Sequence, residues 1–140
     1  MAKDESAQGS PVGRLKRRAD FLRVAGARRK WAAPGLILQV CPQPERISAE
    51  QISAEPDPAF PVRVGFTASR KVGNAVMRNR ARRRLKAIVA ELVGSHAKPG
   101  HDLVLIARTA TCDRPFEDLK RDLLQSLKRT KAARPEGERH

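Results

Sequence analysis

A run of basic residues between Arg70 and Lys86 holds the residue types of this chain best suited to chemistry. It contains eight Lys and Arg residues and no Asp or Glu. Arginine outnumbers lysine in it, and a guanidinium can donate two parallel hydrogen bonds to one phosphate. The chemistry that the run could do is therefore binding of a polyanion, for which RNA is the best candidate.

The apolar residues in and after this run recur with the α-helical period of about 100° per residue. They fall in one narrow arc, with Val89 at its edge: Met77, Ala81, Leu85, Ile88 and Leu92. The opposite side carries polar residues: Asn79, Arg80, Arg82, Arg83 and Lys86. Arg78 and Arg84 flank the apolar arc, where long side chains can bury their stems. The alternative is a solvated face of no particular role, but the absence of acids favours a cationic binding surface.

A catalytic site within the protein itself is not indicated. His101 and Asp102 are neighbours in a predicted strand, so their side chains point to opposite faces. Glu117 and Asp118 fit the first turn of a helix, where acids are favourable. No carboxylate cluster suits two metal ions. We therefore expect no catalytic and no metal-binding residues.

The overall charge agrees with an anionic partner. The 140 residues carry 29 Lys and Arg against 15 Asp and Glu, a formal net charge of +14. This excess predicts salt-sensitive binding to phosphates. No stretch approaches the roughly 20 apolar residues that span a bilayer, and Met1–Gly13 lacks an apolar signal segment. We expect a cytoplasmic protein without a membrane partner, in which Cys41 and Cys112 are reduced thiols.

Periodicity and breaker residues divide the chain into elements. The predicted helices cover 18–26, 74–93 with Asn74 as N-cap and Gly94 as terminator, and a last segment from Pro115 to about Thr130. The predicted strands cover 36–41, 62–69 and 103–107, with an extra short strand around 30–33. The run 103–107 is apolar throughout, as expected for a central strand. We expect disorder in residues 1–13, one domain over 14–130, an exposed insertion at 45–61 and a frayed tail at 131–140.

Phe21 is the aromatic residue whose role is open. It lies in the first predicted helix near Arg17 and Arg18, so it could stack on a nucleobase. It could equally belong to the core. Both interpretations stand at this point.

The segment from Phe66 to Arg83 resembles the signature of the protein subunit of bacterial ribonuclease P, with its Arg-Asn-Arg motif at Arg78, Asn79 and Arg80. Arg14–Phe21 resembles the start of that domain, and Asp102–Arg108 resembles its last strand. The resemblance covers roughly residues 14–130. It implies an α/β (α+β) sandwich: a small mixed, mostly antiparallel sheet of about four strands, three helices, and a left-handed βαβ crossover against the usual right-handed rule.

The resemblance also implies a division of labour within a ribonucleoprotein endonuclease, a hydrolase that matures tRNA. The RNA subunit, with bound Mg²⁺, would remove the 5′ leader of precursor tRNA, and the protein would hold no cofactor tightly. The residues implied in RNA-subunit binding are Arg70, Lys71, Asn74, Arg78, Asn79, Arg80, Arg82, Arg83 and Lys86. Those implied in leader binding are Arg17, Arg18, Phe21 and Lys71. No obligate protein partner is implied.

Two departures and three alternatives accompany this resemblance. Ala25 and Gln39 stand where the family often has aromatic residues, so the leader cleft would depend more on cations. The same composition would also suit a ribosomal-type protein that only braces RNA, an independent nuclease, or a DNA-binding protein that places the basic helix in a major groove.

Overall fold

The computed structural model of the protein describes residues 12–43 and 62–133. Five strands form one sheet in the order β1-β4-β5-β3-β2. The strands are β1 Val12–Arg14, β2 Arg29–Ala32, β3 Leu36–Pro42, β4 Val62–Thr67 and β5 His101–Ala107. The helices are α2 Arg18–Gly26, α3 Ala75–His96 and α4 Phe116–Arg129, with a short 3-10 helix, η3, at Thr109–Cys112.

The sheet is mixed, and the predicted α+β class and three α-helices are confirmed. β1 pairs with β4 and β4 with β5 in parallel, whereas β3 pairs with β5 and β2 with β3 antiparallel. The sheet thus has five described strands rather than about four, and half of its pairings are parallel rather than a minority. β5 is the central strand, as its apolar run predicts. α3 joins the neighbouring parallel strands β4 and β5; the left-handed path of this crossover stays a prediction.

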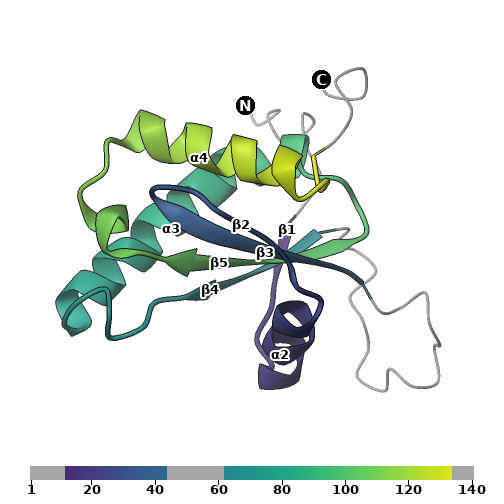
Figure 1. The fold of residues 1–140 in the computed structure, drawn as a ribbon, viewed down its shortest axis with the longest axis horizontal. Helices are drawn as coiled ribbons and strands as arrows, with labels where there is room; N and C mark the ends of the chain where they lie inside the picture. The colour runs from purple at the N-terminus through teal and green to yellow at the C-terminus, as the bar shows by residue number, and fades with distance from the viewer. Residues whose placement is uncertain (1–11, 44–61, 134–140) are drawn as a thin grey trace, which may run out of the picture.

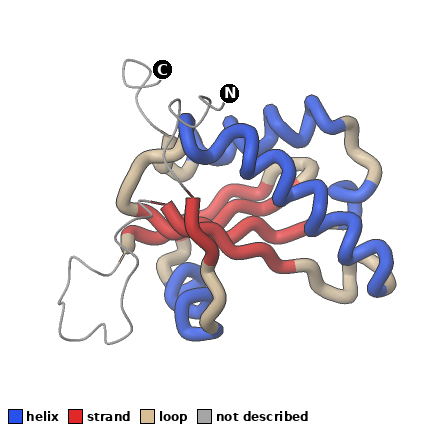
Figure 2. The backbone as a smooth tube through the Cα atoms, turned by 180° about the vertical axis from the view of Figure 1, so that it is seen from behind, coloured by secondary structure: helices blue, strands red, loops and turns tan. Residues whose placement is uncertain are grey.

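The helices cover the sheet on both faces. α3 and α4 lie side by side on one face, and α2 lies on the other (Figure 1), an arrangement also visible from behind (Figure 2). The larger core fills the space under α3 and α4. Leu85 and Ile88 of the predicted α3 arc are fully buried there, as are Leu119, Leu123 and Leu127 of α4. A smaller cluster under α2 joins Leu15, Val24, Cys41 and Val104. Each large aliphatic side chain buried in this way contributes about 1.5–3 kcal/mol.

Several predicted boundaries were wrong; the strand predicted over 62–69, for instance, ends at Thr67. Val12 and Gly13, expected to be disordered, belong to β1, whose three residues pair with β4 and are too few to show a period. α3 continues two residues beyond Gly94, because the tertiary packing of buried Val93 and Ala97 outweighs the low helix propensity of glycine. Residues 131–133, expected to fray, are ordered, since Ala132 is buried and Ala133 pairs with Ala97; the rest of the predicted tail lies outside the described residues. The predicted insertion at 45–61 lies outside the described residues.

Candidate RNA interface

The N-terminal end of α3 is held by a short turn and a side-chain cap. The Asn74 side chain accepts a hydrogen bond of 2.9 Å from the backbone N–H of Met77, which confirms it as the N-cap. Before it, Gly73 has φ +146°, a conformation that favours glycine, and Val72 is buried. No acid lies in the first turn of α3. The free N–H groups and the positive end of the helix dipole therefore face outward beside Arg70 and Lys71, which favours anions.

Most of the residues predicted to bind the RNA subunit are solvent-exposed. Exposed ones are Arg70, Lys71, Asn74, Asn79, Arg80, Arg83 and Lys86, whereas Arg78 and Arg82 are half-buried. Arg82 donates to the Asn79 Oδ1 at 2.8 Å, and Arg78 donates to the Gly73 carbonyl at 3.1 Å. Across residues 12–43 and 62–133, no carboxylate forms an ion pair with these cations. Their charge is therefore available to an external anion.

Arg80 has an internal partner that the helical period did not reveal. Its Nε donates to the Cys112 carbonyl at 3.2 Å, and Arg84 Nη1 donates to the same oxygen at 2.8 Å. A further Arg84 nitrogen donates to the Arg114 carbonyl. These bonds hold the C-terminal end of η3 against α3. Arg80 thus has a structural contact in addition to its predicted role, and Arg84 lies half-buried, as its flanking position predicts.

The cationic surface of α3 extends to the edge of the sheet. The Arg14 guanidinium carbon and the Lys86 Nζ each lie 5.9 Å from the centre of the Phe66 ring. Such cation–π contacts are worth about 0.5–1 kcal/mol at exposed sites. Phe66 packs against the main core and places both cations beside β1 and β4. Arg14 is therefore a candidate contact that the sequence did not assign.

The four predicted leader-binding residues fall into two places. Arg18 and Phe21 lie on α2 and Arg17 is its N-cap residue, with both arginines exposed. Phe21 is half-buried in the smaller core, and a Cβ atom built on Gly65 would come within 2.5 Å of its Cζ. The ring thus covers the backbone of β4 and keeps part of its surface in solvent. Lys71 lies instead beside α3, where its carbonyl accepts a hydrogen bond of 3.4 Å from Thr109.

A buried carboxylate fastens α2 to the sheet. Asp102, with no exposed surface, accepts bonds from Arg63 of 2.9 Å at Oδ1 and 2.8 Å at Oδ2, and a further bond from Arg23 of α2. Burial alone would lower the pKa of Arg23, but its bond to Asp102 and the charge of that carboxylate outweigh burial and raise it. Sequence reasoning missed this network. The signal was an acid within an apolar strand, because buried charges are normally paired.

His101 and Asp102 do not act on a shared partner. The Nδ1 of His101 lies 3.2 Å from the Lys98 carbonyl and 3.3 Å from the Pro99 carbonyl, while Asp102 binds two arginines. Within the described ranges, no group of three His, Cys, Asp or Glu side chains is arranged to hold a metal ion. No helix of that part of the chain is both long and apolar enough to cross a membrane.

Comparison with known proteins assigns this architecture to a family. The family model described as Ribonuclease P matches residues 11–131. The ribonuclease P protein component of Paramagnetospirillum magneticum is 55% identical over 121 residues, which cover 86% of this chain and 84% of that protein. The chain belongs to the bacterial ribonuclease P protein family. The family's member from Gluconacetobacter diazotrophicus is 43% identical over 116 residues, covering 83% of this chain and 89% of that one.

Solved structures of the family share the fold. The ribonuclease P protein from Staphylococcus aureus superposes with a TM-score of 0.62 at 26% identity, covering 88% of this chain and 92% of that chain. The resemblance drawn from the Arg-Asn-Arg segment is therefore confirmed. Membership makes the chain the protein subunit of a tRNA-processing endoribonuclease complex that has an RNA partner.

Proposed function

We propose that the chain binds the catalytic RNA subunit of ribonuclease P through the exposed side of α3 and the turn before it. The observation that carries this proposal is the row of cations on α3, which form no ion pair with any carboxylate of the described residues. Like charges one turn apart on a helix repel each other, so this row is a local cost that an RNA backbone would relieve. Arg83 is exposed and forms no hydrogen bond or ion pair in the described part of the chain, so it is placed to meet a phosphate directly.

The face of α2 would hold the 5′ leader of precursor tRNA. Arg17 and Arg18 offer phosphate contacts, and the exposed part of the Phe21 ring offers a base-stacking surface. Because mature tRNA lacks the leader, contacts to it favour the precursor by differential binding. Mg²⁺, held mainly by the RNA, would supply the hydrolytic chemistry. The protein would raise the affinity for substrate and steady the active RNA.

Competition binding tests the identity of the nucleic acid. The full chain is bound to a fluorescent ribonuclease P RNA at 0.15 M salt, and unlabelled duplex DNA or a structured ribosomal RNA fragment is added. We expect both competitors to need far higher concentrations than unlabelled ribonuclease P RNA. Equal displacement by duplex DNA would contradict the proposal, and equal displacement by the ribosomal fragment would favour a general RNA-bracing role.

Replacing Phe21 with leucine separates its two roles. Leucine keeps apolar contact with the smaller core but removes the aromatic face, so we expect precursor-tRNA affinity to fall by about 1–3 kcal/mol. Affinity for mature tRNA and for the RNA subunit should not change. The measurement is the dissociation constant of the assembled enzyme for both tRNAs. An unchanged precursor affinity with a lower melting temperature would mean that Phe21 is purely a core residue.

A further inference from the structure

Three segments far apart in the sequence meet at the C-terminal end of α4. The Arg29 side chain donates to the Thr130 carbonyl at 2.7 Å and to the Lys131 carbonyl at 3.2 Å. The backbone N–H of Lys98 donates to the Ala132 carbonyl at 2.6 Å. The start of β2, the loop after α3 and the end of α4 therefore form one continuous corner of the molecule, which we call the α4 corner.

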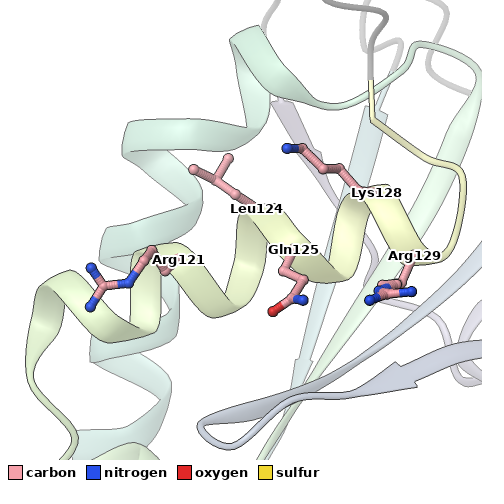
Figure 3. A pocket seen from close by; sticks show the side chains of 5 residues that line it. All are labelled: Arg121, Leu124, Gln125, Lys128 and Arg129. Carbon is pink, nitrogen blue, oxygen red and sulfur yellow. The ribbon is translucent and has the colours of Figure 1, made fainter.

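The α4 corner is cationic and free of acids. Its basic residues are Arg28, Arg29, Lys98, Lys128, Arg129 and Lys131, all exposed except half-buried Arg29. Residues 21–43, 92–101 and 123–133, which build the corner, contain no Asp or Glu. From Lys128 and Arg129 a shallow pocket runs along α4 toward Arg121 and out of the corner (Figure 3). By contrast, Lys120 and Arg121 on the same helix are paired with carboxylates.

Two basic residues of the corner occupy backbone positions that normally favour glycine. Arg28 has φ 62° and Lys131 has φ 64°, the two positive-φ residues other than glycine in the described ranges. Each follows the C-cap of a helix, Ala27 of α2 and Thr130 of α4. At Lys131 the two bonds of a Schellman motif are present, Lys131 N–H to Lys128 O and Ala132 N–H to Leu127 O. Glycine would relieve this local strain, so the sequence keeps charge there at the expense of stability.

The α4 corner is remote from the N-terminal surface of α3. Lys98 follows the C-terminal end of α3, whose 22 residues span about 33 Å at about 1.5 Å per residue. A folded RNA is large enough to contact both the N-terminal surface of α3 and the α4 corner, whereas a single phosphate group can occupy only one of them. The corner's aromatic residue, Trp31, is half-buried, and the Arg129 guanidinium lies 5.0 Å from its ring centre. Because that cation competes with a base for the ring, the corner suits phosphates better than stacked single strands.

The local field supports this assignment. Burial chiefly lowers the pKa of His101, although its contacts with the Lys98 and Pro99 carbonyls act to raise it. The positive charges of Arg29 and Lys98 make smaller contributions that lower it. Arg29 and Lys98 thus disfavour a positive charge on the neighbouring imidazole, as is expected beside a cationic surface.

We propose that the α4 corner is a second RNA-binding surface, which contacts the phosphate backbone of the RNA subunit at a segment different from the one bound by α3. This inference rests on the proposed function. The protein would then bind two segments of the RNA at once, and the length of α3 would set the distance between the two binding surfaces.

The double variant Arg28→Gly with Lys131→Gly tests the inference without loss of the fold. It removes two charges where glycine is conformationally preferred, so the melting temperature should stay the same or rise. We expect affinity for ribonuclease P RNA at 0.15 M salt to fall roughly tenfold or more, and the slope of log K against log salt to shrink by about two units. The control Lys120→Gln with Arg121→Gln removes the same net charge from paired positions and should leave both quantities nearly unchanged.

The outcomes are distinguishable. Wild-type protein that fails to bind the RNA would refute the proposed function itself. Wild-type binding with an unchanged slope in the glycine variant, or an equal loss in the control, would overturn the α4 corner alone. Normal RNA-subunit affinity with weaker precursor-tRNA binding by the assembled enzyme would also overturn it, because the occupant would then be the substrate.

Discussion

Replacing Arg82 and Arg83 with glutamine should weaken binding to ribonuclease P RNA about 30-fold at 0.15 M salt, or about 2 kcal/mol. The reason is the loss of two phosphate contacts, each of which contributes about one unit to the salt slope. Within residues 12–43 and 62–133, Arg83 forms no hydrogen bond or ion pair, and the side chain of Arg82 bonds to Asn79 on the same helix, so the fold should be little affected. Dissociation constants measured from 0.05 to 0.5 M salt give both the affinity and the slope.

The same control, Lys120→Gln with Arg121→Gln, separates site-specific contacts from net charge, because it removes two charges that carboxylates already pair. Arg80 is a poorer choice for this test, since its bond to the Cys112 carbonyl would mix folding with binding. If the α3 variant kept the wild-type slope, the exposed side of α3 would not be the RNA contact.

Replacing Asp102 with asparagine should lower the free energy of unfolding by about 3 kcal/mol, the lower end of the range for breaking a buried ion pair. The amide removes the charge that compensates Arg23 and Arg63, and it turns an N–H group toward guanidinium donors. A domain of this size should then melt at least about 12 °C lower. Thermal and urea unfolding measure the change, with exposed Asp113→Asn as the control.

The Asp102 variant also reports on α2. Since Arg23 links α2 to this carboxylate, the residues of α2 proposed to bind the leader should lose their fixed position. Precursor-tRNA affinity of the assembled enzyme should therefore fall more than affinity for the RNA subunit. A melting temperature within about 1 °C of the wild type would contradict the role assigned to this network.

The sequence predicted well those features that repeat within one element. The apolar period of α3 identified most of its buried residues, though not Val93, and also its cationic side. The uninterrupted apolar run of β5 predicted a central strand. Asn74 was identifiable as an N-cap from residue type and position alone. In these cases the physical cause lies within a few residues of the chain.

Features that depend on distant residues escaped prediction. Arg80 and Arg84 bind a carbonyl about thirty residues away, and β1 exists only because β4 lies beside it. The burial of Phe21 could not be predicted, because the missing side chain at distant Gly65 determines how deeply its ring is buried. The α4 corner combines three segments that carry little meaning separately. The positive φ of Lys131, a backbone conformation that favours glycine, distinguishes this corner more clearly than its amino-acid composition does.

The central claim is that the protein provides cationic surfaces and the RNA performs the hydrolysis. The most direct measurement is single-turnover cleavage of precursor tRNA at low Mg²⁺ by ribonuclease P RNA, by the chain, and by both together. The account predicts correct 5′ cleavage by the mixture, little by the RNA under these conditions, and none by the chain alone. Cleavage by the chain alone, or a mixture no faster than the RNA, would contradict it.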